Sequence, residues 1–456
     1  MPHPAAPAAD LDAPAVTQAL ARFVATHPSG GWDAAVEAEA HRTLLNWVGC
    51  AIGAAQHEAV SMALAACQVL QPAPQAAVLG RRERVDMGSA ALVNGIASHT
   101  FDFDDTHLKT IIHPAGPVAS ALLALGEHLG SSGRELIDAL VLGVDVSCRL
   151  GNMVYPDHYD RGWHITGSTG GLGAAAGCAR LLGLDEWHTQ MALGIAASQP
   201  VGLREQFGSM TKPLHPGAAA RSGLMAALLA QQGFTASPRA IEAPRGWAQV
   251  VSTKFDWSEA THDLGQRFEI SMNSYKPFAC GIVIHPSIEA CVRLREQGIT
   301  PDLIERIELR VHPLVLELTG KREPVDGLQA KFSVFHGCAA GLMFGRAGEA
   351  EFADDVVLRA DVIELRRRVN VHVWPGIAED AVDLTAWLMD GREVKVTVLH
   401  AAGSSSNPMS DAALDAKFYQ LVEPMVGANR AWSLAAWCRG AAQQANLRQL
   451  TALATD

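Results

Sequence analysis

The sequence predicts a mainly α-helical protein, in which a large helical domain built from both chain ends carries a smaller α+β domain inserted near the C-terminal third. Three observations lead to this prediction. Apolar residues follow a helical period from about residue 15 to residue 249. From about 265 to 402 the period changes to the alternation typical of strands. After residue 403 the helical pattern returns, so the two helical parts are expected to form one domain.

The first part of the chain reads as a series of helices. Val16, Leu20, Phe23 and Val24 recur at the spacing of one helix face. Later stretches such as GAAARSGLMAALLAQQGF are rich in Ala and Gly, so we expect these helices to approach one another closely. Turn signals such as HPSGGW, GSSGRE and LLGLDE separate them, with Gly after a helix and Asp or Ser before the next.

The strands are expected in three stretches of the α+β domain. RIELRVHPL alternates apolar and polar residues from position 307, and RVNVHVWP does so from position 369. AWLMDGREVKVTVLH indicates two strands around the turn dipeptide Asp390-Gly391. We therefore divide the chain into residues 1–264 and 403–456, which form the helical domain, and residues 265–402, which form the α+β domain.

Composition excludes several classes of protein. The 456 residues carry a net charge of −12, which argues against a surface for nucleic acid or an anionic membrane. No apolar run approaches the roughly 18–20 residues of a membrane span, and the first residues lack the pattern of a secretory signal. The eight cysteines are scattered without a C-x-x-C pair. We therefore expect a cytoplasmic protein without a zinc or iron–sulfur centre.

One stretch, SHTFDFDDTHLKTIIHPAGPV, concentrates ionisable groups between two apolar helical runs. Three interpretations are open for it: a Mg²⁺ site of the kind that Asp-rich helical enzymes use, a capped helix start with surface charge, or part of an acid–base site. The ligand set for a metal is incomplete, since we find no second carboxylate-rich helix. The residues concerned are His99, Asp102, Asp104, Asp105, His107 and His113.

Three further segments carry a cationic or titratable side chain at a predicted helix boundary. They are GWHITGSTGGLGAAAG, GSMTKPLHPG and SYKPFACGIVIHP. Helix N-termini and cations together attract anions, so such clusters in an acidic protein indicate where an anionic substrate binds. The residues are His164, Lys212, His215, Lys276 and His285.

The chain resembles the MmgE/PrpD family over nearly its whole length. The stretches that carry the resemblance, in order, are DFDDTH…HPAGPV, GWHITGSTGGLGAAAG, GSMTKPLHPGAAARSGLMAALLA, YKPFACGIVIHP, AKFS and NPMSD…KF. The resemblance implies that the inserted domain acts as a lid, that the active site lies between the two domains, and that the protein is a homodimer. It implies no metal and no organic cofactor.

The resemblance also implies which residues form the site. The family pattern falls on Asp102, Thr106, His113, His164, Lys212 and Lys276. Two positions depart from it. Gly281 stands where decarboxylase relatives have a His, and His336 in AKFSVFHG stands where many relatives have a Tyr. We expect His336 to face the cleft of the helical domain and to replace that Tyr as a proton donor.

The residue types then suggest the chemistry. Lys212, His215 and Lys276 would bind substrate carboxylates and stabilise an enediolate. His113 or His164 would serve as base or acid, and Asp102 would orient a histidine. We expect a cofactor-free lyase that dehydrates a hydroxy-di- or tricarboxylate such as 2-methylcitrate.

Other activities stay open at this point. With the same residues the protein could decarboxylate a substrate of the cis-aconitate type or epimerise one of the iminodisuccinate type. Two further alternatives come from different classes: an Asp-rich Mg²⁺ enzyme, and a helical binding protein without catalytic activity.

Overall fold

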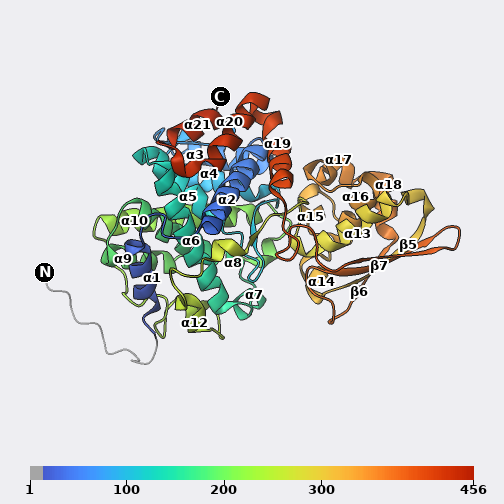
Figure 1. Ribbon diagram of the computed structural model, residues 1–456, viewed down its shortest axis with the longest axis horizontal. Coiled ribbons are helices and arrows are strands. Elements are labelled where there is room, and N and C mark those ends of the chain that lie inside the picture. The colour runs from blue at the N-terminus through green and yellow to red at the C-terminus, as the bar shows by residue number, and fades with distance from the viewer. Residues whose placement is uncertain (1–13, 456) are drawn as a thin grey trace.

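The computed structural model describes residues 14–455, and it is mainly α-helical, as predicted. Figure 1 shows a large helical body, with a smaller group of helices and strands beside it. The helices of the first part are α1 (Val16–Thr26), α2 (Ala34–Gly53), α3 (Glu58–Gln68), α4 (Met87–Thr100), α5 (Ala115–Leu129), α6 (Gly133–Val154), α7 (Asp157–Asp160), α8 (Ile165–Leu181), α9 (Glu186–Ala197), α10 (Thr211–Gln231), α11 (Trp247–Val251) and α12 (Trp257–Thr261).

Small residues let the central helices of this body touch at their backbones. A Cβ added to Gly95 of α4 would lie 2.5 Å from the Cα of Gly217 in α10. A Cβ added to Gly173 of α8 would lie 2.6 Å from the carbonyl oxygen of Gly143 in α6. Both distances are shorter than real contacts, so a side chain at either position would push the helices apart. The Ala- and Gly-rich composition is therefore explained by close helix packing.

The smaller group of elements contains a four-stranded sheet with the strand order β6-β5-β7-β8. Strand β5 pairs parallel with β6 and antiparallel with β7, and β7 pairs antiparallel with β8 through the predicted turn at Gly391. Helices α13, α16 and α18 pack on the sheet. Their bounds are α13 (His285–Glu296), β5 (Ile304–Val311), α14 (Pro313–Thr319), α15 (Gly327–Ala330), α16 (Val334–Phe344), α17 (Asp354–Val357), α18 (Ala360–Arg367), β6 (Val369–Val373), β7 (Val382–Leu388) and β8 (Glu393–Val398).

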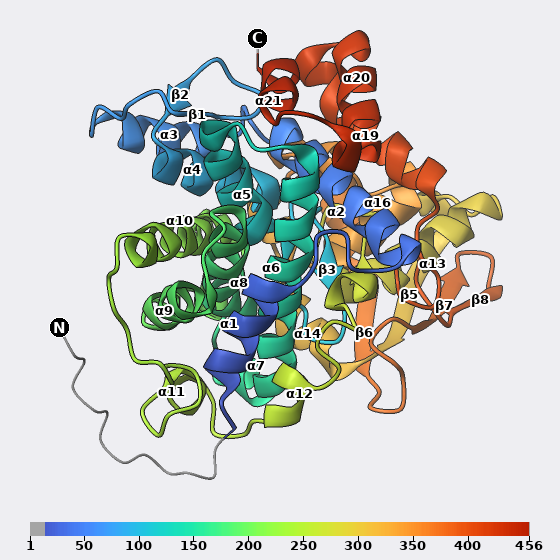
Figure 2. The same cartoon turned by 60° about the vertical axis from the view of Figure 1, so that its left-hand side comes forward.

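The C-terminal helices return to the helical body. Helices α19 (Asp411–Val426), α20 (Ala428–Arg439) and α21 (Arg448–Ala454) follow the sheet in sequence, and α19 and α20 pack against α2. Figure 2 shows them above α2, together with the early helices. Between residues 14 and 455, no helix combines the length and the apolar character that crossing a membrane requires.

Two short strand pairs were not predicted from the sequence. Strand β1 (Ala76–Ala77) pairs with β2 (Arg84–Val85), and β3 (Thr106–His107) pairs with β4 (Asn273–Ser274). The second pair is important for the site, because it joins the Asp-rich segment after α4 to the segment that leads into the smaller group of elements. Thr106 lies opposite Ser274, two residues before Lys276.

Candidate active site

Three helix starts bring the predicted site residues towards one point. His113 lies two residues before α5, His164 is the residue before α8, and Lys212 lies in the first turn of α10. The partial positive charge at helix N-termini favours bound anions at such a point. Asp102, in the turn after α4, has a left-handed backbone with φ of 51°, which is uncommon outside glycine and is frequent at functional sites.

Asp102 holds two ammonium groups. Its Oδ1 accepts hydrogen bonds from Lys212 Nζ at 2.9 Å and from Lys276 Nζ at 2.6 Å. Burial acts to raise the pKa of this carboxyl, but the two lysines outweigh burial and hold the pKa well below its usual value. The sequence-based expectation that Asp102 orients a histidine is therefore wrong, because its carboxylate is bound to the lysines instead.

The two lysines come from distant parts of the chain. Lys212 lies against the stacked rings of Phe207 and Phe332, with its Nζ 5.4 Å and 5.1 Å from their centroids. Burial lowers the pKa of Lys212, and Asp102 acts against this. Lys276 also donates to the backbone oxygen of Asp102 at 3.0 Å. Ammonium groups held in this way can bind a carboxylate without reorganising.

His113 presents one nitrogen to the pocket as a proton acceptor. Its Nδ1 lies 2.8 Å from the backbone oxygen of Asp105 and 3.3 Å from Thr106 Oγ1. Because a carbonyl oxygen can only accept, Nδ1 carries the hydrogen and Nε2 keeps its lone pair. Burial lowers the pKa of His113 well below its usual value, against the effect of Asp104. The imidazole is therefore neutral and available as a base.

His164 and His215 form a second imidazole pair. Their Nδ1 atoms lie 2.9 Å apart, so only one of the two carries a hydrogen. When that hydrogen is on His215, His164 keeps its own on Nε2, where it can be donated. Burial lowers the pKa of both rings, to about 4 for His215.

His99, Asp104 and Asp105 form hydrogen bonds around the loop that carries Asp102. His99 Nδ1 lies 2.7 Å from Asp104 Oδ2, and the other Asp104 oxygen lies 3.5 Å from His113 Nδ1. Asp104 therefore has the place beside the histidines that the sequence assigned to Asp102. Asp105 accepts from Asn273 Nδ2 at 2.9 Å, and burial together with Asp104 raises its pKa to about 8. Sequence reasoning noted His99, Asp104 and Asp105 without giving them separate roles.

Asp102, His113, His164, Lys212 and Lys276 line one cavity, whose volume of about 30 Å³ is smaller than that of most small-molecule sites. Tyr159 was not selected from the sequence, although it lies only five residues before His164; its ring lines the same cavity beneath the Arg204 guanidinium, 4.1 Å from the ring centroid. The polar lining residues are Asp102, His113, Tyr159, His164, Lys212, Lys276 and Thr319. The apolar ones are Ile111, Phe207, Ile282, Val283, Leu318 and Phe332.

Three predicted residues lie outside the set that lines this cavity: Thr106, His215 and His336. His336, in α16, is fully buried, and its Nε2 lies 2.9 Å from the backbone oxygen of Glu351. Its ring packs against Phe352. The expectation that His336 faces the cleft as a proton donor is therefore wrong, because the smaller group of elements encloses it. His215 stands behind His164 and does not line the cavity.

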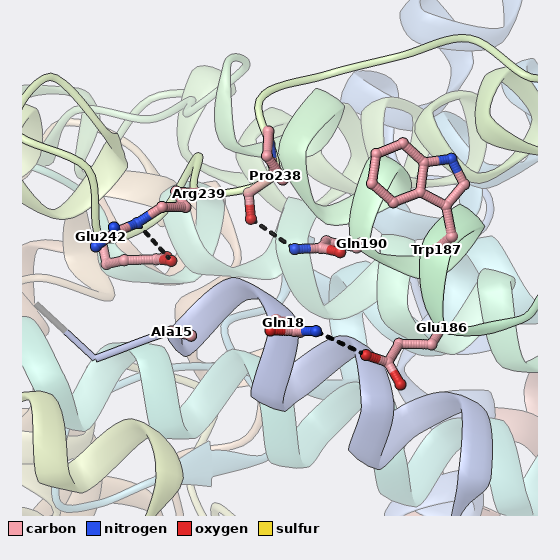
Figure 3. A pocket seen from close by; sticks show the side chains of 8 residues that line it. All are labelled: Ala15, Gln18, Glu186, Trp187, Gln190, Pro238, Arg239 and Glu242. Carbon is pink, nitrogen blue, oxygen red and sulfur yellow. Dashed lines mark hydrogen bonds and ion pairs between the residues drawn. The ribbon is translucent and has the colours of Figure 1, made fainter. Parts of the chain in front are cut away.

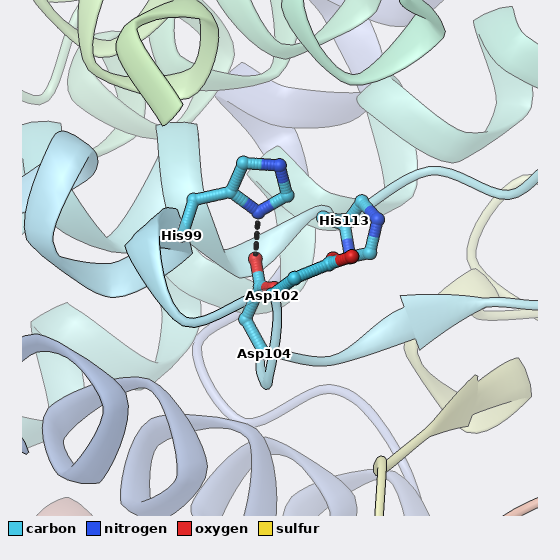
Figure 4. A group of neighbouring side chains, drawn as sticks. All are labelled: His99, Asp102, Asp104 and His113. Carbon is cyan, nitrogen blue, oxygen red and sulfur yellow. Dashed lines mark hydrogen bonds and ion pairs between the residues drawn. The ribbon is translucent and has the colours of Figure 1, made fainter. Parts of the chain in front are cut away.

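The metal interpretation can be tested against the charges. His99, Asp102, Asp104 and His113 each offer one ligand atom, and these atoms lie within 4.8 Å of one another (Figure 4). However, Lys212 and Lys276 already neutralise the Asp102 carboxylate, and their positive charges would repel a divalent cation. The Nδ1 of His113 donates its hydrogen to the Asp105 carbonyl, so this nitrogen has no lone pair for a metal. The arrangement fits an acid–base site better than a metal site.

Lys417 of α19 supports the site from the C-terminal end of the chain. Its Nζ donates to Asn46 Oδ1 at 2.8 Å, to the Phe103 oxygen at 2.6 Å and to the Lys276 oxygen at 3.0 Å. One buried ammonium group therefore connects α2, the residue after Asp102, and Lys276. The sequence signal was the KF of NPMSD…KF, which by itself gave no role.

Another hollow lies on the outside of the helical body, between α1, α9 and the segment before Glu242 (Figure 3). Gln18 donates to Glu186 there at 3.1 Å, and Gln190 donates to the Pro238 oxygen at 2.6 Å. Arg239 and Glu242 form an ion pair there, and none of the predicted site residues lines this hollow.

Comparison with known proteins gives a consistent result. The model of the MmgE/PrpD N-terminal domain matches residues 18–260, and that of the MmgE/PrpD C-terminal domain matches residues 278–439. A cis-aconitate decarboxylase of Aspergillus terreus is 27% identical over 354 residues, which is 72% of each chain. The Homo sapiens cis-aconitate decarboxylase is 30% identical over 63% of this chain and 61% of its own. The 2-methylcitrate dehydratase of Escherichia coli K12 is 22% identical over 75% of each chain.

Proposed function

The chain belongs to the MmgE/PrpD family, and from this premise we propose that it is a lyase that dehydrates a hydroxy-polycarboxylate of the 2-methylcitrate type. One observation carries the proposal. A proton-accepting nitrogen of His113 and the ring of His164 line the same cavity as two ammonium groups. An elimination needs a base, an acid and charge stabilisation, and this cavity offers all three.

In the proposed reaction, substrate carboxylates bind Lys212 and Lys276, which lie beside Asp102. His113 Nε2 takes the proton from the carbon next to a carboxylate, and the lysines stabilise the enediolate that forms. The C–O bond then breaks, its electron pair leaves with the oxygen, and His164 Nε2–H protonates that oxygen to give water. Asp104, 3.5 Å from His113 Nδ1, stabilises the imidazolium formed in the first step.

Decarboxylation is the second candidate. The decarboxylase relatives are 27–30% identical to this chain, against 22% for the dehydratase relative. In that reaction CO₂ would leave, and a carbanion would remain on the substrate. A protonated His113 or His164 would then donate a proton to that carbanion. Gly281 speaks against it, because its position lines the cavity without a side chain that could donate a proton.

A substrate panel followed by NMR in D₂O tests the proposal. The panel contains citrate, 2-methylcitrate, cis-aconitate and iminodisuccinate. We expect a new olefin from 2-methylcitrate. Loss of CO₂ from cis-aconitate would select the second candidate. Deuterium exchange without net change would indicate an epimerase, and no reaction with any acid would contradict a lyase of this type.

We further propose that residues 265–402 close over the cavity as a lid. Both groups of elements contribute residues to the cavity wall. The helical body contributes His113, His164 and Lys212, and the smaller group contributes Leu318 and Phe332. Closure would exclude water and strengthen each charge interaction. Family membership also suggests a cytoplasmic homodimer, and light scattering of the purified protein should then give twice the mass of the chain.

A further inference from the structure

Lys331 is a buried lysine of the smaller group of elements, and the proposed reaction gives it no role. It follows α15 directly, its exposed fraction is 2%, and it is not among the residues that line the cavity. The sequence contains it in the motif AKFS, which by itself gave no role. Burying an ammonium group is costly unless the group is well bonded, so its contacts indicate what it does.

Both ends of Lys331 hold the segment that follows Lys276. Its Nζ donates to the backbone oxygen of Ala279 at 3.0 Å, and its own backbone oxygen accepts from the Gly281 N–H at 3.0 Å. Ala279 lies three residues after Lys276, and Gly281 lines the cavity. Lys331 therefore fixes, at two points, the chain that leads from Lys276 into the cavity wall.

The same ammonium group also lies beside the residue that precedes Asp102. The Nζ of Lys331 is 5.6 Å from the ring centroid of Phe101, which belongs to the helical body. A cation within about 6 Å of an aromatic ring is attracted by the face of that ring. The Glu349 carboxylate pairs with the ammonium group and balances its charge. Lys331 thus contacts both chain segments that carry the Asp102–Lys276 ion pair.

Lys417 makes a similar set of contacts from α19. Its Nζ lies 4.0 Å from the centroid of the Phe103 ring and donates to the backbone oxygen of Lys276. Asp102 is therefore preceded by Phe101 and followed by Phe103, and each of these rings lies beside a buried ammonium group. One ammonium group belongs to the C-terminal helices and the other to the smaller group of elements.

We propose that Lys331 is a positioning residue, which holds Lys276 and the turn at Asp102 in the arrangement that binds a substrate carboxylate. This inference rests on the proposed function, and it adds a residue through which the smaller group of elements acts on the site. Lys331 acts through Ala279, Gly281 and Phe101, since it does not line the cavity itself.

Hydrogen exchange tests the inference without any ligand. Removing Lys331 alone would leave Glu349 without its cation, so the test compares Glu349→Gln with the double variant Lys331→Met/Glu349→Gln. We expect exchange at residues 99–104 and 273–284 to be at least about threefold faster in the double variant, because the contacts with Ala279 and Phe101 are lost. Faster exchange confined to α16 and its neighbours, with both segments unchanged, would overturn the inference. If the double variant does not fold, Lys331→Gln/Glu349→Gln replaces it, with the same expected result.

A double-mutant cycle tests whether Lys331 acts through Lys276. Citrate is the probe, and its binding is measured by titration calorimetry. In the Glu349→Gln background, Lys331→Met should weaken citrate binding by about threefold to tenfold. When Lys276→Met is also present, the same replacement should change binding by less than about twofold. Equal factors in both backgrounds would overturn the inference, and where citrate binds too weakly to be measured, the exchange result decides.

Kinetics separate positioning from a loss of folded protein. A smaller folded fraction lowers kcat and leaves KM unchanged, whereas a displaced Lys276 weakens substrate binding. With 2-methylcitrate, the double variant should show a KM raised by about threefold to tenfold and a kcat lowered at least about tenfold relative to Glu349→Gln. Lys395→Met, on an exposed strand, should retain both wild-type values. Equal KM and kcat in Glu349→Gln and the double variant would count against the inference.

Failure of the proposed function is separable from failure of the inference. If 2-methylcitrate and the other acids of the panel all fail to react, the proposed function fails. Hydrogen exchange at the two segments and the citrate cycle then still decide whether Lys331 positions Asp102 and Lys276.

Discussion

At the scale of single residues, the direction of one hydrogen bond determines what His113 can do. Its Nδ1–H donates to the Asp105 carbonyl, which leaves Nε2 as the acceptor. The same residue would be an acid if Nδ1 faced a donor. Burial keeps the ring neutral, so the base form is present across the ordinary pH range.

Replacing His113 tests this role. His113→Gln keeps a polar side chain but removes the base, so kcat should fall by about 10²–10⁴ while the melting temperature changes little. His188→Gln, at an exposed histidine of α9, is the control and should retain wild-type kcat. A His113→Gln enzyme with more than a tenth of the wild-type kcat would contradict the assignment.

Asp105 makes a separate prediction about pH and stability. Its pKa is raised to about 8 in the folded protein, whereas an unfolded aspartate titrates near 3.9. The folded state therefore binds the extra proton between these values. Its contribution to stability is fully present below about pH 4 and is lost as the pH rises through about 8.

Asp105→Asn removes this titration. The melting temperature of the variant should decrease less than that of the wild type between pH 5 and pH 8, by at least a few degrees if the shift is of the stated size. Asp390→Asn, at an exposed turn, should follow the wild type. Parallel melting curves for wild type and Asp105→Asn would show that Asp105 does not carry the proton.

At the scale of elements, α19 reaches the site through one side chain. Lys417 Nζ donates to the backbone oxygens of Phe103 and Lys276. Phe103 follows Asp102 in the chain, and Asp102 and Lys276 form an ion pair. A shift of about 1 Å in catalytic groups can reduce a rate by about 10²-fold. Helix α19 thus holds the loop at Phe103, which lies more than 300 residues earlier in the chain.

Lys417→Met keeps the length of the side chain and removes its hydrogen bonds. We expect kcat/KM to fall by about 10- to 100-fold. The fall should come mainly from kcat, because the two ammonium groups that bind the substrate carboxylates are still present. Burial lowers the pKa of Lys417 to about 8, so the wild-type rate should decline above that pH, and this step should be absent in Lys417→Met. Lys395→Met, on an exposed strand, should behave as wild type; a Lys417→Met enzyme with unchanged kcat and pH profile would refute the positioning role.

The elements themselves were predictable to different degrees. The long helices and the hairpin at Asp390-Gly391 follow from apolar period and turn chemistry, and these predictions are confirmed. The pair β3–β4 was not predictable, because strands of two residues show no alternation. The paired residues Thr106 and Ser274 are also 168 positions apart in the chain. The motifs predicted which segments form the site. They did not predict which hydrogen-bond partner each side chain has.

His336 illustrates that limit. Its position in the motif suggested a role facing the substrate, but its direction depends on how α16 packs, and α16 turns this ring towards Glu351 and Phe352. The same holds for Asp102 and Asp104, two residues apart. Which of them binds lysines and which lies beside histidines depends on the left-handed turn at Asp102, which the sequence does not reveal.

At the scale of the whole molecule, the segments that join the two groups of elements lie against each other. Gly403 has φ of 87°, and a Cβ there would lie 2.3 Å from the backbone oxygen of Tyr275, next to Lys276. Gly391 has a similar φ of 82° but no neighbour within 4 Å of such a Cβ. A comparison of Gly403 with Gly391 therefore separates the effect of backbone strain from the effect of crowding where the two joining segments meet.

Gly403→Ala should therefore cost more than Gly391→Ala. Both variants bear about 1–2 kcal/mol of strain from the left-handed backbone, but only Gly403→Ala also forces the two crossing segments apart. We expect a lower melting temperature than for Gly391→Ala and a kcat reduced at least several-fold, because Lys276 would move. Equal effects of the two substitutions on melting temperature and kcat would contradict this view of the crossing.

The central claim is that side chains alone, without a metal ion, carry out the lyase chemistry in this cavity. The most direct test is the rate of olefin formation from 2-methylcitrate after dialysis against EDTA, with metal content measured in the same sample. Since Lys212 and Lys276 provide the positive charge that a metal would otherwise supply, the metal-free protein should retain its full rate. Loss of the rate on dialysis, with recovery on adding Mg²⁺ or another divalent cation, would contradict the claim.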